Sequence, residues 1–173
     1  MKLPLALLLA ATLLAACREE VTEAPAPLPL TEEAVSFFCQ MNVLEHGGPK
    51  AQIHLEGLPA PLFFAQVRDG VAYLKSPERD ARILATYVSD MGAAPSWNAP
   101  GERNWIPAEE AHFVIGSRAA GGMGAPEIVP FAAPDAAEAF ILRFGGRTVR
   151  LPDIPDDAAL GPVDPGAFLE TPS

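Results

Sequence analysis

Apolar and polar residues alternate in the first regular part of the chain. In the stretch AQIHLE at residues 51–56, every second side chain is apolar, which is typical of a strand with one buried face. His54 falls on the polar face, where we expect it to be solvated. Two further apolar runs follow, each after a turn that contains glycine. These patterns predict three strands, at residues 51–56, 62–67 and 71–75.

The pattern changes to a spacing of three and four residues over residues 76–92. Ser76 suits the cap of a helix, and Pro77 suits its first position. Gly92 provides a stop signal. The apolar side chains between these signals would share one stripe of a helix: Ile83, Leu84, Tyr87, Val88 and Met91. We therefore predict a helix over this range.

The second half of the chain repeats this order of elements. A glycine-rich loop at residues 118–126 separates two apolar runs. Asp135 and Glu138 have the spacing of a capping box at the start of a helix. We predict strands at 112–117, 127–132 and 147–151, and a helix at 135–144. The order of elements indicates an α+β fold of two ββα-type units, with antiparallel sheets and one helix packed on each.

The N-terminus, MKLPLALLLAATLLAAC, has the features of a secretory signal peptide. Lys2 is followed by an apolar run that is too short to span a bilayer. The last four residues, LAAC, match a bacterial lipobox, so we expect residues 1–16 to be removed and Cys17 to carry lipid. Arg18 stands where an aspartate would retain a lipoprotein at the inner membrane, which favours the outer membrane. The alternative is an ordinary signal peptide with an accidental cysteine.

Composition divides the rest of the chain into three parts. Residues 17–34 are acidic and proline-rich, which predicts an extended, poorly packed tether. The folded domain is expected at residues 35–152, and the acidic, proline-rich residues 153–173 are expected to be loose. The 173 residues carry a formal net charge of −10, which argues against nucleic acid as a partner.

Soft donor atoms are the most informative side chains. Lipidation of Cys17 would leave Cys39 without a disulfide partner, and without lipidation a Cys17–Cys39 disulfide is the alternative. Met41 follows Cys39 by two residues. Met123 stands in GGMG without apolar neighbours beside it, which is unusual for a core methionine. A thiolate with thioethers favours Cu(I) over Zn(II), and few ligands on loops suit a site that releases its metal.

Two further residues could belong to the same site. His46, in EHGGPK, is near enough to Cys39 in sequence to complete the ligand set, although HGGPK also suits a tight turn. Met91 lies on the apolar stripe of the predicted helix, so core packing competes with a metal-binding role.

Two other functions stay open on these residues. A thiol-dependent enzyme could pair Cys39 with His46 or His54, but no third orienting group is indicated and the methionines would be unexplained. The chain has no G-x-S-x-G, H-E-x-x-H or phosphate-loop pattern. The other alternative is a metal-free lipoprotein that uses the domain as a docking surface. We favour a metal-binding protein that is not an enzyme.

Several stretches, taken in order, resemble the NosL family of lipoproteins. The resemblance covers about residues 36–150, nearly the whole predicted domain. The stretches are FFCQMNVLEHGGPKAQI, VRDGVAYLKSPE, ATYVSDMG, NWIPAEEAHFVIGS, GGMGAPEIVPF and AFILRFGGR. The resemblance implies two ββα-like units, similar to a domain of organomercurial lyase, which agrees with the order of elements predicted above.

The resemblance also implies a function and a ligand set. It implies a periplasmic chaperone that delivers Cu(I) to maturing nitrous oxide reductase and docks on an ABC-type membrane complex of the same assembly system. The family's thiol ligand would fall on Cys39, and its methionine ligands on Met41 and Met123. Met91, in DMG, also matches a family motif.

Overall fold

Regular elements alternate with loops through the part of the chain that the structure describes. The computed structural model describes residues 24–79, 81–164 and 166–173. The first unit contains η2 (Val43–Glu45), β1 (Ala51–Leu55), β2 (Leu62–Phe64), α2 (Val67–Lys75), β3 (Ile83–Ser89) and β4 (Trp105–Pro107). The second contains β5 (His112–Ile115), β6 (Val129–Phe131), α3 (Pro134–Phe144) and β7 (Arg147–Val149), followed by η3 (Leu151–Asp153) and α4 (Asp156–Leu160).

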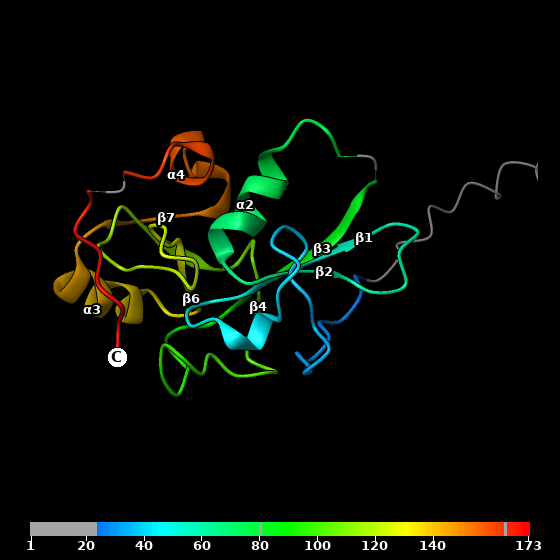
Figure 1. Cartoon of the computed structure of the whole chain (residues 1–173), viewed down its shortest axis with the longest axis horizontal. Coiled ribbons are helices and arrows are strands. Elements are labelled where there is room, and N and C mark those ends of the chain that lie inside the picture. The colour runs from blue at the N-terminus through cyan, green and yellow to red at the C-terminus, as the bar shows by residue number, and fades with distance from the viewer. Residues whose placement is uncertain (1–23, 80, 165) are drawn as a thin grey trace, which may run out of the picture.

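The strands form two antiparallel sheets (Figure 1). The first sheet has the order β2-β1-β3-β4, and the second has the order β6-β5-β7. Helix α2 packs on β1 and β2, and α3 packs on all three strands of the second sheet. The predicted α+β class is confirmed, as are two units that each place a helix after a pair of antiparallel strands.

The helix of the first unit lies earlier in the chain than predicted. The predicted helix at residues 76–92 is wrong, because residues 83–89 form strand β3. This strand is hydrogen-bonded to β1 on one side and β4 on the other. Apolar side chains lie on both faces of β3, with Val88 in a buried cluster and Tyr87 against His54, so they lose simple alternation and can imitate a helical stripe. Its β-branched and aromatic residues, in ILATYVS, suit a strand.

A helix, α2, replaces the predicted turn and strand at residues 68–75. Gly70 was the signal for the turn, but it lies inside α2, against β1. A Cβ atom at Gly70 would come within 2.8 Å of the Cβ atom of Ala51. Glycine therefore allows the helix to approach the sheet closely, which offsets its low helix propensity. In α3, Pro134 occupies the first turn and no side chain caps the helix, so the predicted capping box is also wrong.

The two units share one hydrophobic core. Ile53 and Phe64 of the first sheet belong to the same buried cluster as Phe113 and Ile115 of the second. Val114 lies between these last two residues and belongs to a separate cluster with residues of α3. This alternation is the expected result of a strand that is covered on both faces. The second sheet therefore packs on the first unit with one face and on α3 with the other.

Part of the predicted tether packs on the domain. Leu30 is only 1% exposed and forms a small apolar cluster with Val43. The backbone of Leu28 exchanges two hydrogen bonds of 2.9 Å with the side chain of Gln52. The expectation of a poorly packed segment is wrong for this part of residues 17–34, because its apolar residues and its backbone both find partners on the domain.

His54 is buried beneath the same N-terminal segment. Its ring contacts the side chain of Gln52 at 3.0 Å and the edge of Tyr87. The hydroxyl of Tyr87 donates in turn to the carbonyl oxygen of Pro25 at 2.8 Å. Burial lowers the pKa of His54 below its ordinary value. The prediction of a solvated histidine is wrong, because the segment covers the polar face of β1.

The predicted loose tail is ordered. Residues 156–160 form α4, which packs against α2 and forms a 2.7 Å ion pair between Asp156 and Lys75. Ile154 joins the shared core. Further along, the Glu170 side chain pairs with Arg118 at 2.7 Å, and the red end of the chain runs beside α3 in Figure 1. Acidic and proline-rich composition did not reveal these contacts, because a few apolar residues suffice to anchor the segment.

Substitution of Ile154 tests whether the tail contributes to stability. Ile154 is 1% exposed, so Ile154→Val is expected to lower the free energy of unfolding by about 0.5–1.5 kcal/mol through loss of one buried methyl group. Leu160→Ala, at a side chain that is 55% exposed, provides the matched control with a change within about 0.5 kcal/mol. Urea unfolding measures both. A loose tail would leave both variants at wild-type stability.

The predicted signal peptide at residues 1–16 and the lipidation site at Cys17 lie outside the described residues. Within those residues, no helix has the length and apolar character needed to cross a membrane.

Candidate metal centre

A tight turn carries Cys39 and Met41. The Ser36 N–H donates to the Met41 carbonyl and the Gln40 N–H to the Ser36 carbonyl, both at 2.9 Å. Gln40, between the two sulfur residues, has a positive φ of 58°. Its side-chain amide donates to the carbonyl of Phe37 at 2.7 Å, which helps to hold this uncommon conformation. The Cys39 thiol is half-buried and Met41 is 38% exposed, so both sulfur residues are accessible.

The end of β2 holds this turn in place. The Phe37 N–H donates to the carbonyl of Phe63 at 2.7 Å, and the Ala65 N–H donates to the Ser36 hydroxyl at 3.3 Å. The ring of Phe37 also meets Phe64 edge-on, with 6.0 Å between centroids. Backbone and aromatic contacts together fix the turn relative to residues 63–65.

His46 follows η2 and presents a nitrogen atom without a partner. Its Nε2 atom is buried and makes no hydrogen bond to any described residue. Its carbonyl oxygen accepts a 2.7 Å hydrogen bond from the Nζ atom of Lys50. A buried polar atom without a partner is costly in a folded protein. A metal ion that accepts the lone pair of this nitrogen atom would remove the cost. His46 is therefore suited to a metal-binding role.

Lys50 is fully buried and holds the turn at His46 and Gly47, called the His46 turn, through hydrogen bonds. Besides the carbonyl of His46, its ammonium donates to the carbonyls of Gly47 at 3.1 Å and Ala65 at 3.0 Å. Burial lowers the pKa of Lys50 to about 8, although the negative charge of Glu127 partly opposes the shift. One side chain thus links the His46 turn to the segment that holds the Cys39 turn.

The glycine-rich loop brings Met123 to the same place. The Met123 N–H donates to the Oε1 atom of Gln66 at 3.0 Å. A Cβ atom on Gly122 would come within 2.7 Å of both the His46 Cβ atom and the Gly47 carbonyl oxygen. Only glycine permits this close approach. The loop therefore lies directly against the His46 turn, and the Met123 side chain is 41% exposed.

Residues 63–66 are the common support of the candidate centre. They bind the Cys39–Met41 turn through Phe63 and Ala65, the His46 turn through Lys50, and the Met123 loop through Gln66. The structure thus gathers the segments of four predicted ligand residues around one short stretch of chain: Cys39, Met41, His46 and Met123.

Met91 has different surroundings. Its backbone N–H donates to the carbonyl of Pro130 at 2.9 Å. Its side chain packs against the second hydrophobic cluster, which includes Trp97 and Phe131. These contacts belong to the packing of the second unit, and the structure does not place Met91 among the contacts of residues 63–66.

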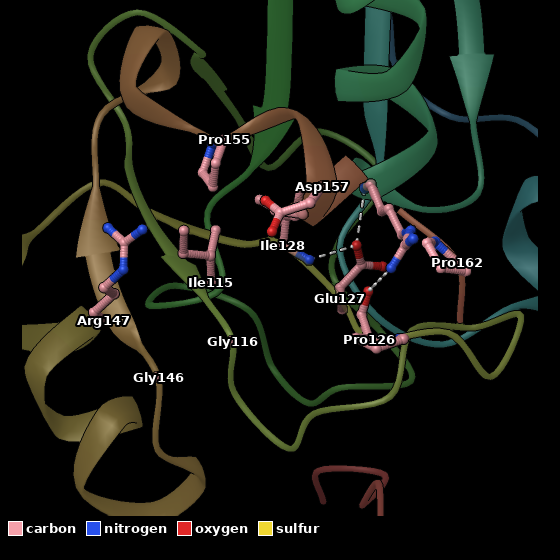
Figure 2. Close-up of a pocket in the computed structure, with 12 residues that line it drawn as sticks. Ile115, Gly116, Pro126, Glu127, Ile128, Gly146, Arg147, Pro155, Asp157 and Pro162 are labelled. Atoms are coloured by element: carbon pink, nitrogen blue, oxygen red, sulfur yellow. Dashed lines mark hydrogen bonds between the residues drawn. The ribbon is translucent and has the colours of Figure 1, made fainter. Parts of the chain in front are cut away.

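Glu127 is a buried carboxyl group next to the glycine-rich loop. Figure 2 shows its Oε1 atom accepting hydrogen bonds from the N–H groups of Arg68 and Ile128, both at 2.9 Å. Its Oε2 atom has no partner among the described residues and lies 2.6 Å from where a Cβ atom on Gly121 would be. Burial raises the pKa of Glu127 to about 8. Glu127 also lines an open cavity of about 470 Å³ between α4 and the second sheet.

Sequence patterns did not identify Lys50, Gln66 and Glu127. Lys50 directly precedes a buried strand, and Glu127 opens the run EIVPF. A charged residue beside an apolar run is therefore the sequence feature that could have identified both. Gln66 carries no such signal. Among the described residues, no three His, Cys, Asp or Glu side chains cluster in a way that could hold a metal ion. The predicted centre is of a different kind, because two of its donors are methionine sulfur atoms.

Comparison with known proteins identifies the family. Residues 27–159 match the family model described as NosL. The chain belongs to the NosL family. It is 54% identical over 159 residues to the copper-binding lipoprotein NosL of Achromobacter cycloclastes, which covers 91% of this chain and 82% of the relative. It is 30% identical over 144 residues to the copper-binding lipoprotein NosL of Stutzerimonas stutzeri, covering 83% and 73%.

Solved NosL structures have the same fold. The crystal structure of the copper chaperone NosL from Shewanella denitrificans superposes with a TM-score of 0.69 at 31% identity, over 76% of this chain and 96% of that one. The solution structure of apo-NosL from Achromobacter cycloclastes gives 0.50 at 54% identity, over 70% and 95%. The family resemblance seen in the sequence is confirmed. These relatives carry the names of a copper-binding lipoprotein and a copper chaperone, not of enzymes, in agreement with the prediction.

Proposed function

We propose that this protein is a lipid-anchored periplasmic chaperone that binds Cu(I) and delivers it to maturing nitrous oxide reductase. Cys39, Met41, Met123 and His46 would supply the ligands. The observation that carries the proposal is the gathering of the three segments that carry these four residues around residues 63–66. The names of the relatives, a copper-binding lipoprotein and a copper chaperone, support it independently.

The donor atoms suit Cu(I). A thiolate and thioethers are soft ligands, which Cu(I) prefers, and a neutral imidazole is compatible with it. The unpartnered Nε2 atom of His46 supports its place in the set. Zn(II) more often takes four Cys, His or carboxylate ligands and rarely methionine. Met91 was a further candidate, but its packing in the second hydrophobic cluster supports a structural role.

Exposure of the sulfur residues suits a chaperone that must release its metal. Met41 and Met123 are 38% and 41% exposed, so ligands of a second protein could approach the bound ion. Copper would then pass by ligand exchange, one donor at a time. Weakly donating thioethers would leave first, and the Cys39 thiolate last.

The lipidated Cys17 would place this site at a membrane surface in the periplasm. The lipobox supports the anchor, and the absence of an aspartate after Cys17 supports the outer membrane. Nitrous oxide reductase as the target, and an ABC-type assembly complex as the docking partner, are what the family resemblance implies. With a net charge of −10, the protein is unsuited to binding nucleic acid.

Copper transfer in vitro tests the proposed delivery. A chain beginning at residue 18 is loaded with one Cu(I) and mixed with copper-free nitrous oxide reductase in the presence of a chelator that scavenges free copper. We expect the reductase to gain copper, measured by metal analysis after separation, and Cys39→Ala to transfer none. Equal transfer from both proteins would contradict the proposal. Normal reductase maturation in cells that carry Cys39→Ser with Met41→Leu would favour the metal-free docking alternative.

A further inference from the structure

We propose that Gln66 and Lys50 are positioning residues of the copper site, an inference that rests on the proposed function. Neither side chain supplies a ligand in the proposed site. Gln66 aligns the loop that carries Met123, and Lys50 aligns the turn that carries His46. Together they would set the spacing of ligands that come from three separate segments of the chain.

Gln66 is placed to control Met123. It is 3% exposed and directly follows the stretch that holds the Cys39 turn. Its Oε1 atom accepts the Met123 N–H at 3.0 Å, and its Nε2 atom donates to the Oδ2 atom of Asp69 at 3.3 Å. The contact with Asp69 fixes the amide orientation, so that the oxygen faces the loop. The Gln66 side chain thus links the backbone of Met123 to residues 63–66, which also hold the turn that carries Cys39.

The hydrogen bond from Met123 to Gln66 matters because the glycine-rich loop is conformationally free. Gly121 lies so close to the Gln66 side chain that a Cβ atom there would meet its Oε1 atom at 2.5 Å. Gly124 adopts a positive φ of 77°. Glycines make a loop conformationally free, so the entropic cost of ordering it is high. A fixed acceptor such as Gln66 is therefore needed to hold Met123 in register.

Lys50 has the equivalent role for His46. Its three ammonium protons match three carbonyl oxygens, of His46, Gly47 and Ala65. The first two lie on the His46 turn, and the third lies on the support. Loss of the ammonium would leave these carbonyls without this donor and release the turn. Supporting residues of this kind typically change metal affinity by 10- to 100-fold without touching the ion.

The test combines affinity measurements with double-mutant cycles. Cu(I) affinity is measured by competition with a chromophoric Cu(I) chelator for the reduced chain beginning at residue 18. Gln66→Leu is expected to weaken binding by roughly tenfold. In a Met123→Leu background, the same change is expected to cost less than about twofold, because the residue it positions is already lost. In a His46→Ala background, the tenfold cost is expected to remain.

Lys50→Leu is expected to show the reverse pattern, with its effect lost in the His46→Ala background and retained with Met123→Leu. If Lys50→Leu does not fold, as judged by circular dichroism, the Gln66 cycle alone decides. An unchanged affinity in Gln66→Leu would overturn the inference, as would an equal loss in every background, which is the signature of a general structural defect. A wild-type chain that does not bind Cu(I) would overturn the proposed function as well, so the two failures are distinguishable.

Discussion

Cys39→Ala is expected to lower the affinity for Cu(I) by at least about a hundredfold, which exceeds the usual loss from a supporting residue. Cys39 is the only thiol in the described part of the chain. As a thiolate it would be the only anionic donor among the proposed ligands, and neutral thioethers and imidazole cannot replace its charge. Competition with a chromophoric Cu(I) chelator measures the change for the reduced protein.

Two methionines provide matched controls for this prediction. Met123→Leu is expected to weaken binding by less than Cys39→Ala does, because a thioether is a weaker donor than a thiolate. Met91→Leu removes the same sulfur atom from the second hydrophobic cluster and is expected to leave the affinity unchanged. Tight binding that survives in Cys39→Ala, or a Met91→Leu variant that loses affinity as Cys39→Ala does, would contradict the proposed ligand set.

The fold class was predictable because element order survives errors in individual elements. Two antiparallel strand pairs, each followed by a helix, were visible in apolar runs and turns. The exact helix in the first unit was not, because β3 is a central strand whose apolar positions imitate a helical stripe. Gly70 is a second reason why the position of this helix was not predicted. A local pattern cannot distinguish a glycine in a turn from a glycine that lets α2 approach Ala51.

The candidate site, like the fold, was only partly predictable from the sequence. Cys39, Met41 and Met123 could be singled out by residue type, since soft donors in such contexts have few other uses. Their convergence on residues 63–66 could not, because it depends on hydrogen bonds, to backbone and side-chain acceptors, between segments more than 20 residues apart. Lys50 and Gln66 are ordinary residues by type, and only their buried contacts reveal a role.

Glu127→Gln is expected to change how stability depends on pH. Burial raises the pKa of the Glu127 carboxyl from 4.5 to about 8 in the folded protein. Between these values the folded state keeps a proton that the unfolded state has released. Stability is therefore expected to fall as pH rises from about 4.5 to 8, with a slope of up to ~1.4 kcal/mol per pH unit from this one group. Glutamine keeps the size and an acceptor for the two N–H groups but does not titrate, so the slope is expected to flatten.

Lys50 acts in the opposite direction at higher pH. Burial lowers the pKa of its ammonium from 10.5 to about 8, so above pH 8 the unfolded state holds a proton that the folded state has lost. Stability is expected to rise again between about pH 8 and 10.5. Together, these two groups should therefore produce a minimum of stability near pH 8. In Glu127→Gln the rise above pH 8 should persist, because Lys50 still titrates, while the fall below pH 8 should be reduced.

Urea unfolding at intervals from pH 5 to 10 measures both the fall of stability below pH 8 and its rise above pH 8. The Glu127→Gln variant keeps all other titratable groups, so the expected result is a smaller slope rather than a flat line. Glu109→Gln, at an exposed carboxylate, should reproduce the wild-type curve. A Glu127→Gln curve parallel to wild type between pH 5 and 8 would mean that Glu127 is ionised in the folded protein, stabilised by the positive charge of the Lys50 ammonium. In that case the variant should instead be less stable than wild type at every pH above 5, because it would leave that ammonium without its counter-charge.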